Sequence, residues 1–395
     1  MLIDTFSTPA WQIKVFDRIA DLDETLWDTT MAHDHPFRSH RFMMMLEASY
    51  PERAYRYLVA RAHGAERVAG LLFATQQHLD LLSEAPSWAV RCTEVVRRLL
   101  PLAGMLRIAM LGCFETAGRH WWVDPEHDET ELFAVLESCA RHALPKARVH
   151  VVRDLENDAP ISRDLHRLLL GLGFRACNNY PLALIRLEGR DWSAHYTRLK
   201  ANSRKILKKA LSAYDASGYR VIHHEGTVPD LAQLYALYVN THQQATEYHR
   251  EVLPMALFQR LQGSGLAVFS VLHAPGGQAV AFVLSGVSDK VINPFLFGRD
   301  YDVELPVNAY YVLHIDLMRH YISPDTHMVD LGITNYFVKQ NLGCELSDNR
   351  FYLKLSNPVL HRILGHHVAK MFDIRQPTQR RVFRAGRADG QGSSA

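Results

Sequence analysis

The stretch VDLGITNYFVKQNLGCELSDNRFYLKL, Val329 to Leu355, places several reactive side chains at one tight joint. Its apolar spacing and its glycine stop predict a short strand, a helix and a second strand. Asp330, Asn335, Tyr336 and Lys339 fall at the strand-to-helix joint. A carboxylate accepts protons, and a phenol and an ammonium group donate hydrogen bonds, so these residue types suit acid–base and electrostatic catalysis. The structural alternative is that Asp330 caps the joint, Lys339 lies on a solvated helix face and Asn335 belongs to the turn.

A similar order of elements occurs earlier, in LHRLLLGLGFRACNNYPLALIRL, Leu165 to Leu187. Each half of the chain reads roughly as helix, strand hairpin, strand, helix, strand, helix, glycine and strand. Residues 53–79 predict a hairpin, 128–144 a helix after an acidic first turn, and 266–298 three strands joined by the turns Pro275-Gly276-Gly277 and Ser288-Asp289. We therefore expect a mixed α/β unit of about half the chain to be used twice. The predicted N-terminal domain spans 1–190 and the C-terminal domain spans 191–375. The remainder, 376–395, is basic and then rich in glycine and serine, which predicts a disordered basic tail.

The totals limit the classes of protein that the chain can belong to. A length of 395 residues suits two domains. The formal net charge of +2 is nearly balanced, so binding to nucleic acid would need a local basic patch, and we predict no DNA partner. The cysteines are dispersed and form no C-x-x-C motif, which indicates reduced thiols in the cytoplasm. They are Cys92, Cys113, Cys139, Cys177 and Cys344.

The sequence gives no sign of membrane insertion. The N-terminus has no basic region followed by an apolar run, so no signal peptide is predicted. The longest apolar stretches are broken by proline, glycine and arginine before they reach the ~20 residues that span a bilayer. We therefore predict a soluble, cytoplasmic protein without a transmembrane segment, and nothing in the sequence points to a membrane surface.

Two further polar stretches are candidates for binding. THQQATEYHRE, 241–251, is a polar break between two predicted helices. YTRLKANSRKILKKA, 196–210, is a helical run with no acidic residue, which suits the phosphates of a nucleic acid, coenzyme A or a carrier-protein arm. Its candidate phosphate-binding residues are Lys200, Arg204, Lys205, Lys208 and Lys209. The alternatives are a plain solvated loop for the first stretch and a solvated helix face for the second.

Other residues that could do chemistry lack the required spacing. His223-His224 and His366-His367 are adjacent pairs, whereas a helical zinc site needs histidines four residues apart, so no metal site is predicted. Neither a G-x-S-x-G motif nor a P-loop occurs. Of the tryptophans in HWWVD, 120–124, one could line a pocket, but ordinary packing is the preferred interpretation.

The repeated order, closing with helix, glycine and strand, resembles the GNAT acyltransferase fold. LLLGLGFRACNNYPLALIRL is similar to the closing helix, loop and strand of that fold. YTRLKANSRKILKKA, FLFGRDYD, NAYYVLHIDLMRH and VDLGITNYFVKQNLG resemble the Fem-type and BioF2-like acyltransferases, which carry two tandem GNAT-like domains. The resemblance covers most of 38–358 at the level of the fold and is specific over about 195–345. It implies an α/β (α+β mixed-sheet) fold of two tandem GNAT-like domains.

The resemblance also implies a reaction. Fem-type enzymes take aminoacyl groups from aminoacyl-tRNA and extend a peptide on a cell-wall precursor, and relatives transfer acyl or aminoacyl groups to amines of small metabolites. In a GNAT-like sheet the fourth and fifth strands splay apart and the acyl group lies in the gap. Lys339 or Tyr336 would then donate to the oxyanion, and Asp330 would accept or relay the proton. The first domain has no comparable cluster, so we expect it to have lost the reaction.

The same resemblance indicates where an acceptor would bind. In GNAT-like folds the loop between the first two helices covers the acceptor, which makes Glu247, Tyr248 and His249 candidates for substrate binding. Arg299 in FLFGRDYD and Tyr310 in NAYYVLHIDLMRH complete this set. The expected acceptor is a small amine.

The chain departs from ordinary GNAT enzymes at the donor site. Those enzymes hold the pyrophosphate of acetyl-CoA with Q/R-x-x-G-x-G/A at a helix start. The corresponding joint here, GRDYDVELPVNAYY, 298–311, has one glycine and three acidic side chains, and RLQGSG, 260–265, is a chance match at a helix end. This departure and the basic helix favour aminoacyl-tRNA or a carrier-protein thioester as co-substrate, with no tightly bound cofactor. Two alternatives stay open: an acyl-CoA N-acetyltransferase with an atypical CoA site, and a non-catalytic, ligand-binding GNAT pair.

Overall fold

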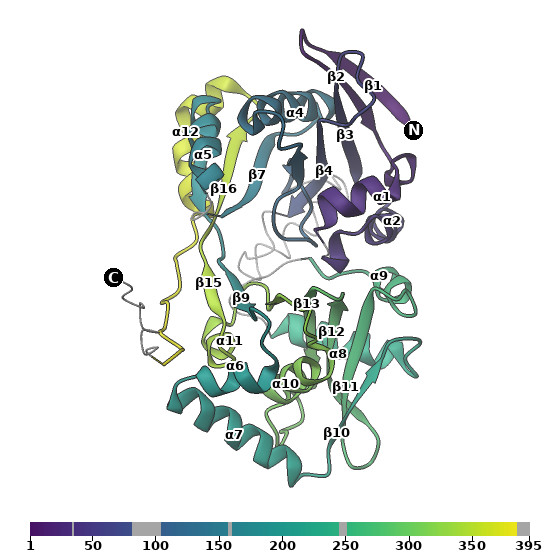
Figure 1. The fold of residues 1–395 in the computed structure, drawn as a ribbon, viewed down its shortest axis with the longest axis vertical. Helices are drawn as coiled ribbons and strands as arrows, with labels where there is room; N and C mark the ends of the chain where they lie inside the picture. Colours follow the sequence, from purple (N-terminus) through teal and green to yellow (C-terminus); the bar gives the residue numbers. More distant parts are fainter. Residues whose placement is uncertain (34, 81–103, 157–159, 245–250, 385–395) are drawn as a thin grey trace, which may run out of the picture. The chain divides into compact units, whose positions relative to one another are not determined.

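The computed structural model describes residues 1–33, 35–80, 104–156, 160–244 and 251–384, which form two compact units (Figure 1). Unit 1 is built from Met1–Pro181, Tyr248–Leu261 and Ser347–Gln376, and unit 2 from Leu182–Glu247, Gln262–Leu346 and Pro377–Ala395.

These units differ from the predicted domains 1–190 and 191–375, because each half of the chain gives a strand to the other half's sheet. Strand β9 (Leu182–Arg186) pairs with β14 (Met328–Asp330) in unit 2. Strand β16 (Asn349–Leu355) inserts between β7 (Val149–Glu156) and β8 (Arg175–Asn178) in unit 1. Pairing between strands that are far apart in the chain is not visible in local sequence patterns. The sequence therefore predicts one domain boundary, near residue 190, instead of this exchange of strands.

Unit 2 is a seven-stranded mixed sheet in the order β10-β11-β12-β13-β14-β9-β15. The strands not yet given are β10 (Arg220–His224), β11 (Ala267–His273), β12 (Ala279–Val287), β13 (Val291–Arg299) and β15 (Glu345–Ser347). Its helices are α6 (Trp192–Arg198), α7 (Ala201–Asp215), α8 (Leu231–Gln243), α10 (Ala309–Tyr321) and α11 (Tyr336–Asn341). Three strands joined by the turns Pro275-Gly276-Gly277 and Ser288-Asp289 were predicted. They are confirmed as β11, β12 and β13, which pair antiparallel.

Within this sheet the β12–β13 and β14–β9 pairs are antiparallel, whereas the β13–β14 pair between them is parallel. The parallel pairing covers Val291 with Met328 and Ile292 with Val329. Beyond these pairs β13 continues to Arg299, whereas β14 ends at Asp330. The two strands therefore separate at their carboxyl ends, as the resemblance to the GNAT fold implied.

Unit 1 contains a nine-stranded sheet in the order β1-β2-β3-β4-β5-β7-β16-β8, with β6 paired to β4. The strands not yet given are β1 (Leu2–Ser7), β2 (Trp11–Phe16), β3 (Ala54–Ala62), β4 (Gly70–Asp80), β5 (Met105–Leu111) and β6 (Trp121–Val123). Its α-helices are α1 (Glu24–Trp27), α2 (His40–Ser49), α4 (Glu129–Ala143), α5 (Pro160–Gly171), α9 (Met255–Leu261) and α12 (Pro358–Phe372). The predicted hairpin over 53–79 is confirmed as β3 and β4.

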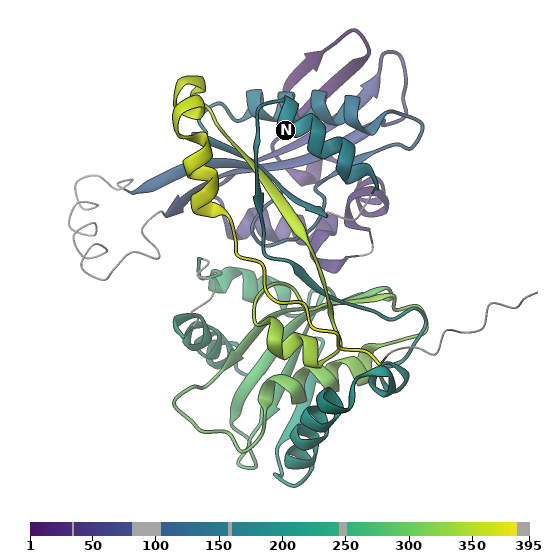
Figure 2. The same ribbon diagram turned by 90° about the vertical axis from the view of Figure 1, so that its left-hand side faces the viewer.

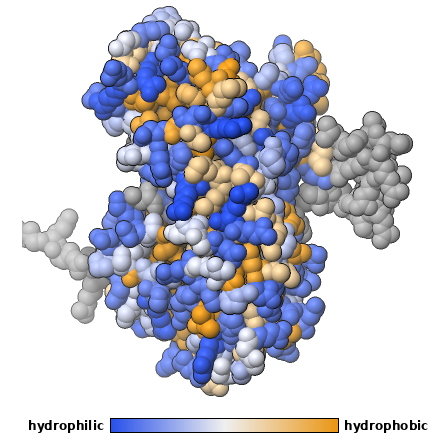
Figure 3. Space-filling view, turned by 90° about the vertical axis from the view of Figure 1, so that its right-hand side faces the viewer, coloured by the Kyte–Doolittle hydropathy of each residue, from blue (hydrophilic) through white to orange (hydrophobic). Residues whose placement is uncertain are grey.

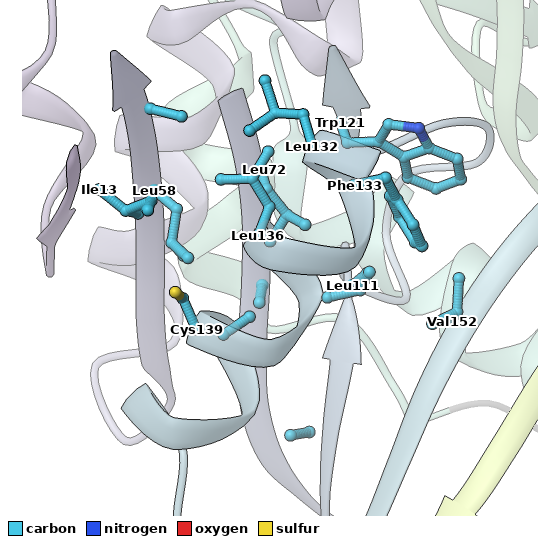
Figure 4. Close-up of a cluster of buried hydrophobic side chains, with 14 of the residues drawn as sticks. Ile13, Leu58, Leu72, Leu111, Trp121, Leu132, Phe133, Leu136, Cys139 and Val152 are labelled. Atoms are coloured by element: carbon cyan, nitrogen blue, oxygen red, sulfur yellow. The ribbon is translucent and has the colours of Figure 1, made fainter. Parts of the chain in front are cut away.

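The core of unit 1 lies between α4 and the sheet (Figure 4). Asp128 caps α4 by accepting a hydrogen bond from the Glu131 backbone, and Leu132 and Leu136 turn toward the strands. Trp121 belongs to this cluster and is 1 % exposed, which confirms the packing interpretation of the HWWVD stretch for this residue.

None of the helices that the structure describes is both long enough and apolar enough to cross a bilayer. Hydrophilic residues predominate on the face shown in Figure 3, where hydrophobic residues lie in small separate groups.

Candidate active site

The joint between β14 and α11 is a strained turn held by side chains. The Oδ1 atom of Asp330 accepts a hydrogen bond of 2.8 Å from the backbone of Gly332. Gly332, Thr334 and Asn335 have φ of +69°, +64° and +49°. A positive φ is unusual for a β-branched threonine, and such strain persists only where the surroundings enforce it. Asp330, 3 % exposed, therefore shapes the turn, as the structural alternative held.

Lys339 is buried at this joint. Its side chain lies on the inner side of α11, 6 % of the residue is exposed, and its Nζ donates a hydrogen bond to the backbone oxygen of Ile333. The alternative of a solvated helix face is therefore wrong for Lys339. Tyr336, in the first turn of α11, is also buried, with 9 % of the residue exposed. The structure thus places the ammonium group of Lys339 out of bulk water, on the helix that directly follows β14.

An aromatic group on α10 and β13 lies near Lys339. The ring of His314 stacks on Tyr310 with 3.9 Å between ring centroids, and Phe297 on β13 lies 5.3 Å from Tyr310. Burial lowers the pKa of His314 to about 3, and the charge of Lys339 contributes to this lowering. The Nδ1 of His314 lies 2.7 Å from the Tyr310 carbonyl oxygen, which can only accept, so we assign the proton to Nδ1 and the lone pair to Nε2.

The sequence analysis did not single out His314, because it examined histidines only for the spacing of metal ligands. The available signal was its position: His314 follows Tyr310 by one helical turn, on the helix that follows the splayed strand. It is neutral and buried, with 3 % of the residue exposed. No group of three His, Cys, Asp or Glu side chains is placed to hold a metal ion, within the residues that the structure describes.

The protonation of His314 gives a testable dependence of stability on pH. The unfolded chain binds a proton at His314 below pH 6.5, whereas the folded protein binds it only below about 3. The free energy of unfolding should therefore fall as the pH drops through this window, by at most ~1.4 kcal/mol per pH unit from this residue. Urea unfolding of His314→Gln between about pH 7 and about pH 5 should show a shallower fall than the wild type. An unchanged slope would show that His314 is not the buried neutral group described here.

The predicted substrate-binding residues do not all lie together in the part of the chain that the structure describes. Tyr310 belongs to the aromatic group. The guanidinium of Arg299 donates to the backbone oxygens of Asp300 and Val303, so it shapes its own loop. Glu247, Tyr248 and His249 lie outside the described residues.

The predicted phosphate-binding residues share one helix, α7. Lys205, Lys208 and Lys209 are exposed, and Leu207 and Ala210 face the core. Lys200, also exposed, precedes the first turn. Arg204 is half-buried, and its Nε has no hydrogen-bond partner among the residues described. The arrangement leaves a cationic face, and its ligand stays a prediction.

The C-terminal strap, residues 377–384, packs against unit 2, which corrects the prediction of a disordered tail over 376–395 for these residues. Phe383 pairs with Leu199 in an antiparallel bridge, and the Val382 carbonyl accepts from the Lys200 backbone. The backbone of Arg380 donates to Oε1 of Gln340 at 2.6 Å. Residues 385–395 lie outside the described part.

The strap also reaches the helix that carries Lys339. Nη1 of Arg380 donates to Oδ1 of Asn341 at 3.1 Å, and Nδ2 of Asn341 donates to the Tyr311 hydroxyl at 2.9 Å. The guanidinium lies 4.6 Å from the ring of Phe337. Arg380 therefore links the strap, α11 and α10 through Asn341, which is 0 % exposed.

Removing this link should loosen α11. We expect Arg380→Ala to lower the free energy of unfolding of unit 2 by about 1–2 kcal/mol, because it removes a charged hydrogen bond and a cation–π contact. Urea unfolding measures the change. Arg381→Ala is the matched control, because Arg381 is exposed on the same strap. Equal effects of the two substitutions would contradict the assigned role of Arg380.

Unit 1 repeats the parallel pair, but its end is closed by protein groups. Strands β5 and β7 run parallel up to the pair of Leu111 with Val152. Just beyond, Asp154 has a φ of +62° and is 2 % exposed. Its carboxylate accepts from the Gly118 backbone at 3.1 Å and from the amides of Asn179 and Asn349 at 3.1 and 3.0 Å. In unit 1, the first copy of the repeat, the carboxylate at the strand end thus accepts three hydrogen bonds from the protein's own backbone and side chains.

The parallel pair that separates, the strand order and the helices around it define the GNAT acyltransferase fold. Residues 201–340 match the family model described as an acetyltransferase (GNAT) domain. No curated protein is similar enough in sequence to count as a match.

Solved structures extend the similarity to most of the chain. A crystal structure of FemX shares 11% identity at a TM-score of 0.59, covering 87% of this chain and 98% of that one. A tandem GNAT protein from the clavulanic acid biosynthesis pathway shares 14% identity at 0.51, covering 88% and 99%. The C-terminal domain of a putative lysylphosphatidylglycerol synthetase from Agrobacterium fabrum shares 15% at 0.51, covering 87% and 95%. At these identities the shared feature is the fold, and it confirms two tandem GNAT-like domains.

Proposed function

We propose that unit 2 forms an amide by transferring an acyl or aminoacyl group from an activated donor to an amine. The observation that carries this proposal is the buried ammonium of Lys339, on the helix that directly follows β14, whose charge acts on the buried, neutral His314 of α10. A fixed positive charge in a water-poor site stabilises the oxyanion of an acyl transfer far better than it would in water.

The proposed reaction needs no covalent intermediate on the enzyme. The amine nitrogen attacks the acyl carbon, and the carbonyl oxygen becomes the oxyanion. Collapse of this intermediate expels the donor's thiol or ribose hydroxyl, which takes up the proton lost by the amine. Cys344 is the thiol near Lys339, and burial raises its pKa to about 12, so it stays protonated and is a poor nucleophile.

Each predicted catalytic residue has a role in this proposal. Lys339 stabilises the oxyanion, and the hydroxyl of Tyr336, one helical turn before it on α11, is the alternative donor. The lone pair on Nε2 of His314 accepts a hydrogen bond from the amine. Asp330 keeps the turn in the conformation that presents Lys339, because its Oδ1 accepts a hydrogen bond from the Gly332 backbone. Its carboxylate would also accept or relay the proton.

We assign the reaction to unit 2 rather than to unit 1. In unit 1 the carboxylate of Asp154 binds Gly118, Asn179 and Asn349 at the equivalent strand ends. The end of the strand pair is thus occupied by the protein's own hydrogen bonds, which supports a non-catalytic first unit.

The charges favour aminoacyl-tRNA or a carrier-protein thioester over acetyl-CoA as donor. The joint between β13 and α10 exposes Asp302 and Glu304 where the ordinary GNAT enzymes bind pyrophosphate. The side chain of Asn308 already accepts from the Tyr311 backbone at the start of α10. Phosphates would instead meet the exposed lysines of α7. The resemblance to Fem-type enzymes, which use aminoacyl-tRNA, points the same way.

Titration of three donors tests this assignment. A CoA thioester, a phosphopantetheinyl carrier protein and aminoacyl-tRNA are offered separately at low and moderate salt. We expect tight binding of tRNA or the carrier protein that weakens steeply with salt. For tRNA, replacing Lys205, Lys208 and Lys209 by glutamine should reduce the slope of log affinity against log salt by about 2–3.

The matched control is Lys146→Gln, which removes an exposed lysine from unit 1. It should leave the slope unchanged. Binding of the CoA thioester alone, unaffected by the α7 substitutions, would overturn the assignment and favour an acyl-CoA N-acetyltransferase with an atypical CoA site.

A further inference from the structure

Helix α12, Pro358–Phe372, exposes more large apolar side chains than any other helix or strand that the structure describes. Figure 2 shows it on the outside of unit 1, at the face turned toward the viewer. The exposed side chains and their exposed fractions are Val359 64 %, Leu360 48 %, Ile363 63 %, Leu364 44 % and Met371 80 %. At 100° per residue these positions fall on one stripe along the helix. Their exposure calls for a partner, because soluble proteins rarely leave such a group in water.

The opposite face holds α12 on unit 1, so the exposed stripe is not needed for packing. Ala369 is buried there in a cluster with Leu353 and Cys177. His361 accepts a hydrogen bond from the Leu355 backbone and donates one to the Gly173 carbonyl at 2.7 Å. The helix is therefore presented as a rigid element with its apolar stripe pointing outward.

The charges on α12 favour an anionic partner. Its sequence, PVLHRILGHHVAKMF, contains no aspartate or glutamate. Arg362, His366 and Lys370 are exposed and follow one another along one edge of the apolar stripe, and the exposed His367 lies within it. Two copies of this helix placed face to face would bring like charges together. An anionic bilayer instead presents negative headgroups beside hydrocarbon, in the same lateral order as the cationic flank and the apolar stripe.

We propose that α12 binds the surface of an anionic lipid bilayer, lying parallel to it. The apolar stripe enters the boundary between headgroups and acyl chains, while Arg362 and Lys370 contact lipid phosphates. At 1.5 Å per residue the helix offers a contact about 22 Å long. This inference does not rest on the proposed reaction, since α12 belongs to unit 1.

The test is sedimentation of the full-length protein with vesicles. Vesicles of phosphatidylcholine alone are compared with vesicles that also contain phosphatidylglycerol, at low and moderate salt. We expect the wild type to bind the anionic vesicles at least about tenfold more tightly than the neutral ones. Ile363→Ser combined with Leu364→Ser should weaken this binding more than about tenfold, through the loss of buried apolar surface. Arg362→Gln combined with Lys370→Gln should weaken it to a similar extent and remove most of its salt dependence.

Ile222→Ser is the matched control, because Ile222 is 46 % exposed on β10 of unit 2. It should bind vesicles as the wild type does, and circular dichroism should show all variants folded. Wild-type protein that ignores anionic vesicles, or serine variants that bind them fully, would overturn the proposal. So would a dimer, seen by light scattering without vesicle binding, that Ile363→Ser dissociates, because this face would then belong to a second copy.

Discussion

Replacing Lys339 by methionine should lower kcat by about 10²–10³-fold, the effect of removing one group that stabilises an oxyanion. Methionine is close to lysine in length and keeps the apolar contacts of the stem, but it carries no charge. The proposal places this charge beside the reacting carbonyl, where burial makes it strong. Steady-state kinetics on the donor that the titration identifies measures the loss, which should fall on kcat more than on KM.

Lys339 also has a structural role, because its Nζ donates a hydrogen bond to the backbone oxygen of Ile333. The effect on catalysis must be separated from the loss of this bond. Loss of that bond leaves a buried carbonyl without this donor and destabilises the turn by about 1–3 kcal/mol. Lys339→Arg keeps the charge and should retain more activity than Lys339→Met. Lys208→Met, on the exposed face of α7, is the matched control for kcat. Equal kcat for Lys339→Met and the wild type would remove the lysine from the mechanism.

Replacing Glu115 by leucine should lower the free energy of unfolding of unit 1 by about 3–5 kcal/mol, because it removes the buried carboxylate that pairs with the Arg53 guanidinium. Among the described residues, only the longer ion pairs of Arg53 with the exposed Glu251 and Glu52, at 3.8 and 4.0 Å, then remain. Nη1 of Arg53 donates to both oxygens of Glu115, at 3.0 and 2.9 Å. Each side chain is 3 % exposed, so water cannot replace the missing partner. The guanidinium also lies 3.5 Å from the ring of Tyr50, which holds it in place. Urea unfolding followed by a probe in unit 1 measures the loss.

The double variant Arg53→Met with Glu115→Leu is the control for this prediction. It removes both charges, so it should recover much of the stability that Glu115→Leu loses. Lys146→Met removes an exposed cation from unit 1 and should change little. A double variant no more stable than Glu115→Leu would show that the packing of the site, rather than the unpaired charge, sets the cost.

The sequence was sufficient for the elements that local patterns encode. The hairpin over 53–79, the three strands around Pro275 and Ser288, and the helix after Asp128 all follow from alternation, turn residues and capping. The joint at Asp330 was found because its polar side chains lie close together in the chain. The GNAT fold followed from the order of these elements.

The remaining features depend on contacts between distant parts of the chain. The exchange of β9 and β16 involves pairs such as Val329 with Ile185 and Tyr352 with Val152. The strap was predicted to be disordered because its basic composition hides its bonds to Gln340 and Asn341. The sequence analysis likewise does not predict α12 as a separate element, and its exposed apolar stripe appears only once the helix is seen packed on unit 1.

Formation of the amide product tests the central claim most directly. Wild-type protein is mixed with a labelled donor of each class and with a set of small amines, and mass spectrometry looks for the new amide. The account predicts a product with at least one donor, formed by the wild type and strongly reduced in Lys339→Met. Binding of a donor without any amide product, in wild type and variant alike, would contradict it and would mark the chain as a ligand-binding GNAT pair.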